Sequence, residues 1–526
     1  MYLTANNHKE YQRVYMNIPS YDVFFNNTCG VKPKATTYKE LAGHIAELGN
    51  FESVENTLYY IISNKHNNKQ DKKIMELLMK NVAQKAHGEV FTPEFLVNEI
   101  LDEFESRYPD FFANPKHTVL DFAAGCGNLL KGVINRFFKG TRHLYDNDKE
   151  CMYHILKYQI YAIEYQPNNF KMLCVNLDYE NLVPNNPHFV CANAVGFDYW
   201  DMMYNFDMVF INPPYRISNG KERERKNDDE VYPFFTKLAH NLSKRFVINI
   251  IPSKFLYLND DFTKYFFDLN NVVYMKTFHR SKVCFPTAGI SGGILCYISD
   301  KKYNKDVISV EEVTYSGNIL KGERVIEPDK VYPRSLNCVR MLEKIRQKVN
   351  KFFDELVYSR NTFGIASNYS SKLVDTDDVY KVLCSNNRVE YILKSDVNKN
   401  VDIIDQYKFM IPKAGSASLD ADKDGKIKII GGSSQVVEKD VLFSDTFLCV
   451  AHSKDRAYVE NVEKYFDTKF VNYFMWNALG THNISKDKFC FVPVMDFTKE
   501  WDDNSLYKYF EFSKEEIKEI EDTIKV

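Results

Sequence analysis

The chain has 526 residues, of which 44% are hydrophobic and 26% charged, and its formal net charge is −3. This length allows two or three domains with separate cores, and the composition excludes wholesale disorder and a continuous coiled coil. No apolar run approaches the ~18 residues that span a bilayer, and the N-terminus lacks a signal-peptide pattern. We therefore expect a soluble cytoplasmic protein with no membrane partner.

The 11 cysteines are scattered singly along the chain, without a Cys-x-x-Cys pair. This spacing indicates reduced, mostly buried thiols, and it predicts neither a disulfide framework nor a metal site.

Residues 1–86 are predicted to form a helical N-terminal extension. Leu58, Ile61 and Ile62, followed by Ile74 and Leu77, are apolar residues at helical spacing. This segment carries no nuclease pattern, so we interpret it as a helical cap on the next domain.

A second region begins at His87 with Gly-Glu-Val-Phe-Thr-Pro. Thr92 is the expected N-cap of an amphipathic helix, with Pro93 at its first helical position. A helix start with a hydroxyl is suited to binding a carboxylate, although the pattern alone indicates only a helix start.

The next elements alternate between strands and helices. The stretch from Thr118 to Leu130 predicts a strand, a small-residue turn and a helix. Asp121 ends the strand, and Gly125 and Gly127 allow a backbone to approach a ligand closely.

Two further strands are expected at 160–164 and 188–191. The first ends in Glu164, at the position where Rossmann-like folds bind ribose hydroxyls. Glu164 lies too far beyond Asp121 for the ~20-residue spacing of a dinucleotide fingerprint, which disfavours NAD. Asn193 follows the other strand and could bond an adenine edge.

A fourth strand, 206–211, delivers the turn Asn212-Pro213-Pro214-Tyr215, and more strands are expected at 246–251 and 272–278. The alternation predicts an α/β fold, an open parallel Rossmann-like sheet with helices on both faces.

The turn at residues 212–215 has the hydrogen-bond acceptors and the aromatic ring that could bind a planar amine. The Asn212 side chain and the Pro213 carbonyl could each accept an N–H, leaving the amine lone pair directed at an electrophile. Prolines 213 and 214 favour a tight turn, and Tyr215 offers a flat stacking face. The alternative is a Pro-Pro turn that only ends a buried strand.

These segments occur in a fixed order: Phe-Thr-Pro, Asp-x-x-x-Gly-x-Gly, a strand-ending acid and Asn-Pro-Pro-Tyr. The set resembles the gamma class of S-adenosylmethionine-dependent DNA N6-adenine methyltransferases over about residues 87–300. Residues 283–298 resemble the segment whose Phe, here Phe285, stacks on the target base opposite Tyr215.

The resemblance implies a role for each matched residue. The target adenine would be held by Asn212, Pro213, Pro214 and Tyr215. The methionine part of the cofactor would contact Thr92, Pro93, Asp121, Gly125 and Gly127. The cofactor's ribose would contact Glu164, and its adenine would contact Asn193. The family usually has Asp where Asn193 stands.

The implied activity is methyl transfer from S-adenosylmethionine to an adenine flipped out of double-stranded DNA, without a metal. Such enzymes serve restriction-modification or phage and host DNA protection, with a separate restriction endonuclease as a candidate partner. The alternatives are a methyltransferase for another planar amine, such as protein glutamine, and a non-catalytic DNA-binding modification subunit. A bifunctional restriction enzyme is disfavoured because no nuclease pattern is present.

A basic segment follows Tyr215, and it reads either as a DNA-contacting loop or as a solvated mixed-charge loop. Its candidate DNA contacts are Arg216, Lys221, Arg223, Arg225 and Lys226.

Residues 301–526 are predicted to form an α+β domain, with helices at 333–356 and 458–479 and a capping box at Ser513 and Glu516 opening the last helix. This half resembles target-recognition domains attached to such methyltransferases. The segment 420–425 begins like a calcium loop, but Gly431 stands where a bidentate Glu is required, so we assign it to a hairpin turn.

Overall fold

The computed structural model describes residues 92–194, 206–217, 229–258, 260–286, 290, 292–314, 317–325, 331–371, 378–415, 427, 429, 430, 432–480 and 483–525. The predicted extension 1–86 and the hairpin turn at 420–425 lie outside them. None of the described helices is long and apolar enough to cross a membrane.

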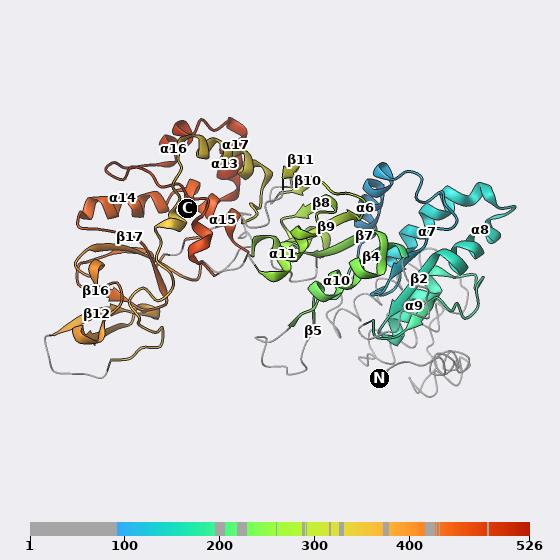
Figure 1. The fold of residues 1–526 in the computed structure, drawn as a ribbon, viewed down its shortest axis with the longest axis horizontal. Helices are drawn as coiled ribbons and strands as arrows, with labels where there is room; N and C mark the ends of the chain where they lie inside the picture. Colours follow the sequence, from blue (N-terminus) through green and yellow to red (C-terminus); the bar gives the residue numbers. More distant parts are fainter. Residues whose placement is uncertain are drawn as a thin grey trace, which may run out of the picture.

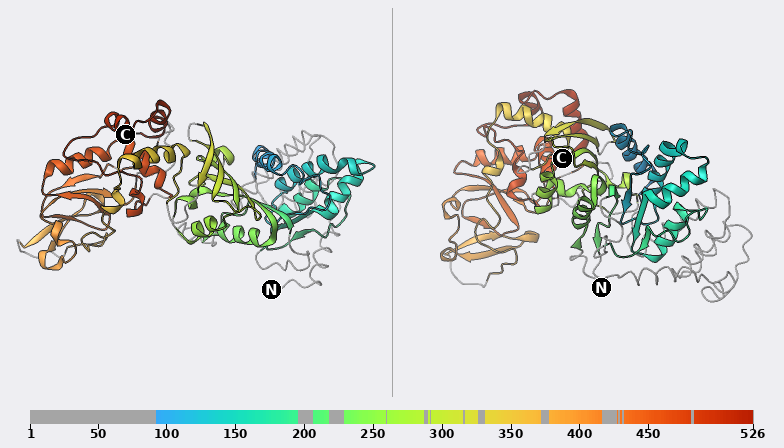
Figure 2. Two further views of the ribbon diagram at one scale, coloured as in Figure 1. Left: turned by 45° about the horizontal axis from the view of Figure 1, so that its top comes forward. Right: turned by 45° about the vertical axis from the view of Figure 1, so that its right-hand side comes forward.

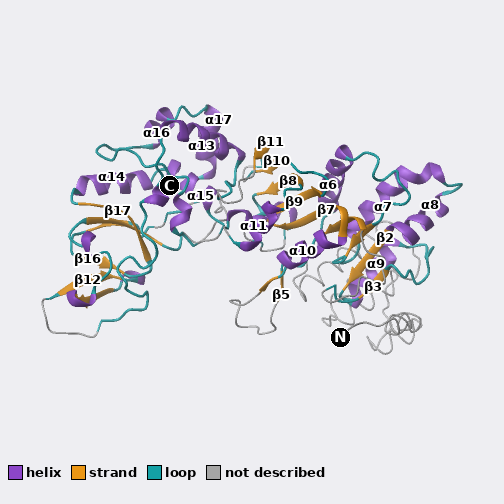
Figure 3. Cartoon of the chain, viewed as in Figure 1, coloured by secondary structure: helices purple, strands orange, loops and turns teal. Residues whose placement is uncertain are grey.

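A nine-stranded sheet forms the centre of the first part of the chain (Figures 1 and 3). Its strand order is β11-β10-β8-β9-β7-β4-β1-β2-β3. The bounds are β1 Val119–Asp121, β2 Ile160–Glu164, β3 Phe189–Cys191, β4 Phe206–Ile211, β7 Ser243–Pro252, β8 Val272–Phe278, β9 Ile294–Asp300, β10 Val307–Val313 and β11 Ile319–Val325.

The strands β3, β2, β1, β4 and β7 are parallel neighbours. Strand order reverses after β1, since the chain runs outward to β2 and β3 and then returns to β4 on the other side of β1. In open α/β sheets the ligand crevice lies at such a reversal, at the carboxyl ends of the strands. The topology therefore points to the β1/β4 edge.

The expected all-parallel sheet is wrong at one end. Strand β9 runs antiparallel to both β7 and β8, and β11 runs antiparallel to β10. Between β8 and β9 the chain forms α12 (Ser281–Cys284), which is too short for the crossover that a parallel pair requires. All seven residues of β9 are buried, and a continuous buried run has the same sequence pattern in either direction.

Helices cover both faces of this sheet, as predicted. One face carries α6 (Glu94–Arg107), α7 (Asn128–Thr141), α8 (Asp148–His154) and α9 (Pro167–Leu177); the other carries α10 (Tyr232–Leu242) and α11 (Asp261–Asp268). Alternate residues of β4 enter opposite cores: Met208 and Phe210 join the α6–α9 core, and Val209 and Ile211 join the α10–α11 core. These features confirm the Rossmann-like α/β fold.

The sheet continues past residue 300, where the sequence predicts a domain boundary, because β10 and β11 belong to it. The remaining chain forms an α+β module (residues 331–525), which lies beside the β8–β11 end of the sheet, with α8 at the far end (Figures 1 and 2). It has two three-stranded sheets: β12 (Val379–Leu383), β13 (Val389–Leu393) and β16 (Val441–Phe443), and β14 (Tyr407–Pro412), β15 (Gln435–Val437) and β17 (Phe447–Ser453). Its helices are α13 (Leu336–Lys348), α14 (Arg456–Phe466), α15 (Lys469–Ala478), α16 (Asp503–Tyr509) and α17 (Lys514–Thr523).

The single helix predicted at 458–479 is two helices, α14 and α15. The Thr468 hydroxyl accepts a hydrogen bond from the Val471 amide and caps α15, so a new helix begins where the apolar pattern alone suggests continuation. The helix predicted at 333–356 is shorter, since Ser335 caps α13 and Val349 is extended. The capping box at Ser513 and Glu516 is confirmed in α17.

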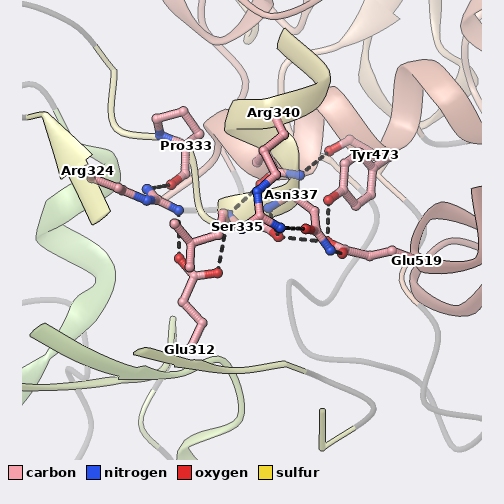
Figure 4. Close-up of polar contacts among 10 residues, drawn as sticks. Glu312, Arg324, Pro333, Ser335, Asn337, Arg340, Tyr473 and Glu519 are labelled. Atoms are coloured by element: carbon pink, nitrogen blue, oxygen red, sulfur yellow. Dashed lines mark hydrogen bonds and ion pairs between the residues drawn. The ribbon is translucent and has the colours of Figure 1, made fainter. Parts of the chain in front are cut away.

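A buried polar network joins the sheet to the C-terminal module (Figure 4). Arg324 of β11 pairs with Glu312 of β10 at 2.6 Å and donates to the Pro333 carbonyl at 2.6 Å. Glu312 also accepts from the Leu336 amide at the start of α13, at 2.7 Å. Both charged side chains are almost fully buried, so each depends on the other and on the chain at 333–336.

A second carboxylate completes this junction from the module side. Glu519 of α17 accepts from the Ser335 hydroxyl at 2.7 Å, and also from Asn337 and Tyr473 (Figure 4). Nearby, the Arg334 guanidinium donates to the Leu479 carbonyl at 2.5 Å. The junction therefore holds α13, α15 and α17 against the sheet.

Candidate active site

Three strand ends meet at the edge that the topology indicates. Asp121 ends β1 and Glu164 ends β2, while Asn212 directly follows β4. Because β1 pairs with both β2 and β4, the structure places the three predicted residues at one edge of the sheet.

The turn after β1 is tight and requires its glycines. Gly125 and Gly127 have φ values of 53° and 86°, a region that disfavours other residues. A Cβ on Gly127 would lie 3.0 Å from Leu177 Cδ2. The Gly125 amide donates to Glu164 Oε2 at 2.8 Å, so the turn and the end of β2 form one unit.

Asp121 is completely buried at this turn. Its Oδ1 accepts from the Ala123 amide at 3.0 Å, whereas its Oδ2 is buried without a hydrogen-bond partner among the described residues. Burial raises the pKa of Asp121 to about 8, with the Ala123 amide lowering it and the nearby charge of Glu164 raising it further. Such a carboxyl is suited to pairing with a ligand cation.

Glu164 is 6% exposed, and its Oε1 accepts from the Gln166 amide at 2.8 Å. Between them lies Tyr165, which is 68% exposed, so an aromatic residue stands beside the strand-ending acid. Tyr165 is absent from the residues predicted above. An aromatic residue directly after the strand-ending acid is a sequence pattern that could have identified it as a site residue. Asn193, also exposed, follows β3 at the same edge.

Thr92 is not the N-cap that the sequence predicts. Pro93, with extended φ and ψ of −70° and 149°, is the cap residue, and α6 begins at Glu94 without a side-chain cap. The Thr92 hydroxyl instead accepts a hydrogen bond from Asn212 Nδ2 at 2.9 Å. Thr92 and Asn212 are therefore brought into direct contact, and Pro93 follows immediately.

In the 212–215 turn, Pro213 is buried, Pro214 is exposed, and Tyr215 is half-buried. Tyr215 packs against both cores of the sheet, and its hydroxyl donates to the Ile250 carbonyl at 3.5 Å. Burial raises the pKa of Tyr215 well above its ordinary value, so the ring stays neutral.

Phe285 follows α12 and is 2% exposed. It belongs to the core cluster against which Tyr215 packs. The two rings predicted to hold the target base thus contact a common core, and the stacking role of Phe285 stays a prediction.

Arg216 begins β5 (Arg216–Ile217), which pairs with β6 (Asp229–Glu230) directly beyond the turn. Its guanidinium lies 3.4 Å from Glu230 Oε1, and Lys254 also pairs with Glu230. The other predicted DNA contacts, at positions 221, 223, 225 and 226, lie outside the described residues.

A strand-order reversal, a glycine turn, two strand-ending acids and a strand-ending amide make this edge the candidate ligand-binding site of a Rossmann-like α/β fold. The model of the family described as "N-6 DNA Methylase" matches residues 72–253.

Similar proteins include an "Uncharacterized adenine-specific methylase" of Mycoplasma pneumoniae, 31% identical over 106 residues, which are 19% of this chain and 24% of that protein. The modification subunit of a putative type I restriction enzyme from Vibrio vulnificus aligns over 50% of this chain and 55% of its own, with 16% identity and a TM-score of 0.34. The type IIG restriction endonuclease BpuSI aligns over 95% and 71%, with 14% identity and a TM-score of 0.44. The chain thus covers about a quarter of the Mycoplasma protein and about half of the Vibrio subunit.

Proposed function

We propose that the chain is a DNA adenine N6-methyltransferase. The observation that carries the proposal is the Asn212 turn, held by Thr92 at the carboxyl end of β4 beside the acids of β1 and β2. The match of residues 72–253 to the N-6 DNA methylase family supports it.

S-adenosylmethionine fits the residues at this edge. Its ammonium group requires an anion, and the Asp121 carboxyl, whose buried Oδ2 lacks a hydrogen-bond partner among the described residues, would become one because a bound cation lowers its pKa. Gly125 and Gly127 both have positive φ, and a side chain at Gly127 would meet Leu177, while Glu164 can accept from ribose hydroxyls. When bound, the cofactor would supply an electrophilic methyl group, and Asn193 and Tyr165 would be the residues available to its adenine.

The residues of the turn would hold the target amine. The Asn212 side-chain oxygen and the Pro213 carbonyl each accept one N–H, which directs the nitrogen lone pair at the methyl group. Tyr215 provides the stacking face, and the adenine leaves the duplex to reach it. No protein nucleophile takes part, and the proton leaves after transfer.

The C-terminal module (residues 331–525) is proposed as the target-recognition domain. On its β12–β13 hairpin, the exposed Tyr391 stands among exposed basic residues, namely Lys381, Arg388 and Lys394. A mixture of aromatic and basic side chains suits contacts with nucleic acid.

The test is methyl transfer from labelled S-adenosylmethionine to duplex oligonucleotides of mixed sequence, with peptides containing glutamine as the competing substrate. We expect label in N6-methyladenine of duplex DNA, and none after Asn212→Ala, with cofactor affinity within about twofold of wild type because Asn212 contacts the target rather than the cofactor. Label in peptide would favour the protein-glutamine alternative, and full activity of the variant would sink the mechanism. Binding of DNA without any transfer would favour a non-catalytic subunit.

A further inference from the structure

We propose that Asn128 and Thr92 are positioning residues that fix which end of the Asn212 amide faces the target amine. The inference rests on the proposed function and deepens it. It assigns Asn128, a residue outside the predicted site, a part in the reaction.

Thr92 is held between two asparagines that come from distant parts of the chain. Its carbonyl accepts from Asn128 Nδ2 at 3.0 Å, and its hydroxyl accepts from Asn212 Nδ2 at 2.9 Å. Asn128 is the first residue of α7, directly after the glycine turn, and Asn212 directly follows β4. The chain of hydrogen bonds therefore connects the proposed cofactor turn to the proposed amine-binding turn.

The burial of Thr92 prevents water from replacing these bonds. Thr92 is only 4% exposed, so water has little access to its hydroxyl or its carbonyl. Asn128 anchors the backbone of Thr92 and thereby sets where the hydroxyl stands. In such a buried network each bond also gains from the low local dielectric.

The orientation matters because an amide is not symmetric. Asn212 has one donor end, Nδ2, and one acceptor end, Oδ1. An exocyclic amine offers two N–H donors, so only Oδ1 can hold it. A threonine hydroxyl can accept from Nδ2 or donate to Oδ1. In this structure it accepts from Nδ2, which turns Oδ1 to the opposite side of the amide, whereas the flipped orientation would set an NH₂ group against the amine.

The first experiment is a double-mutant cycle on the full-length protein, measured as the single-turnover rate of methyl transfer to duplex DNA. Thr92→Val removes the hydroxyl and keeps the shape, and we expect a loss of about tenfold, while Thr92→Ser stays within about twofold. Asn128→Ala should cost about threefold to tenfold alone and less than about twofold in the Thr92→Val background. A merely structural role of Asn128 would give costs that add.

Asn176 supplies the matched control. Its Nδ2 donates to the Cys126 carbonyl at 2.9 Å in the same glycine turn, so Asn176→Ala also removes an amide-to-carbonyl bond, one made to Cys126 rather than to Thr92. We expect its cost to add in full to that of Thr92→Val. Additive costs for Asn128→Ala and Thr92→Val would overturn the inference.

The second experiment needs no activity. Neutron crystal structures, which distinguish an amide nitrogen from an oxygen, of the wild type and of Thr92→Val should show the Asn212 amide rotated in the variant, since valine cannot accept a hydrogen bond. An amide that keeps its orientation would overturn the positioning role. If the wild type transfers no methyl group to any DNA, the proposed function fails, and this comparison still decides the inference.

Discussion

Asp121→Asn should remove a pH dependence from the stability of the protein. Burial raises the pKa of this carboxyl to about 8, from an ordinary value of 3.8. Between these pH values the folded protein keeps a proton that the unfolded chain has released. The contribution of Asp121 to stability is therefore full below pH 3.8 and is lost as the pH rises through about 8.

The size of the effect follows from the shift. Each pH unit in this interval weakens the wild type by about 1.4 kcal/mol, which amounts to about 4 kcal/mol by pH ~7. Asparagine has nearly the same shape, does not titrate, and keeps an oxygen that can accept from the Ala123 amide. We therefore expect the variant to be more stable than the wild type near neutral pH, by a margin that grows with pH.

Urea unfolding of both proteins, without cofactor, at pH ~5.5, ~6.5 and ~7.5 measures this margin. Other titrating groups are shared, so they cancel in the difference between the two proteins. Parallel curves would refute the reasoning, because they would mean that Asp121 is ionised in the folded state.

Three further substitutions test other features. Arg324→Met leaves the buried carboxylate of Glu312 without its ion partner and should cost about 3–5 kcal/mol in unfolding free energy. The double variant Arg324→Met, Glu312→Leu should recover part of this loss. Equal losses of unfolding free energy in the single and the double variant would contradict the pairing. Thr468→Ala removes the cap of α15 and should cost about 1 kcal/mol, whereas Thr468→Ser should be nearly neutral; equal melting temperatures for the two variants would show that the cap is dispensable. Gly127→Ala puts a side chain on a left-handed backbone and against Leu177, and it should lower the unfolding free energy by about 1–2 kcal/mol. Calorimetry should also show weaker binding of S-adenosylmethionine. Unchanged affinity would mean that the turn does not contact the cofactor.

Local pattern was enough to predict the parallel half of the sheet. The strands ending in Asp121 and Glu164 and the strand before Asn212 are where the alternation of strands and helices placed them, because parallel buried strands read as short apolar runs between helices. The convergence of those ends follows from topology alone.

Other features depend on contacts that a single sequence does not reveal. The direction of β9 is set by its short connection to β8, and an apolar run carries no direction. Thr468 interrupts a pattern that continues apolar on both sides. Thr92 looks like a cap from its neighbours, but its hydroxyl meets Asn212 from a distant segment, and the burial of Asp121 depends on the packing around the turn.

The buried pair of Glu312 and Arg324 also bears on how the specificity of such a protein could change. The carboxylate receives the first amide of α13, and the guanidinium donates to the Pro333 carbonyl, so tilting the module would expose two charges and break both of these bonds. These buried bonds therefore oppose any change in the offset between the module and the β1/β4 edge. If the module reads DNA, each recognised base pair lies a set number of base pairs from the methylated adenine. A change in the recognised sequence would then come from replacing side chains on the module rather than from bending the junction.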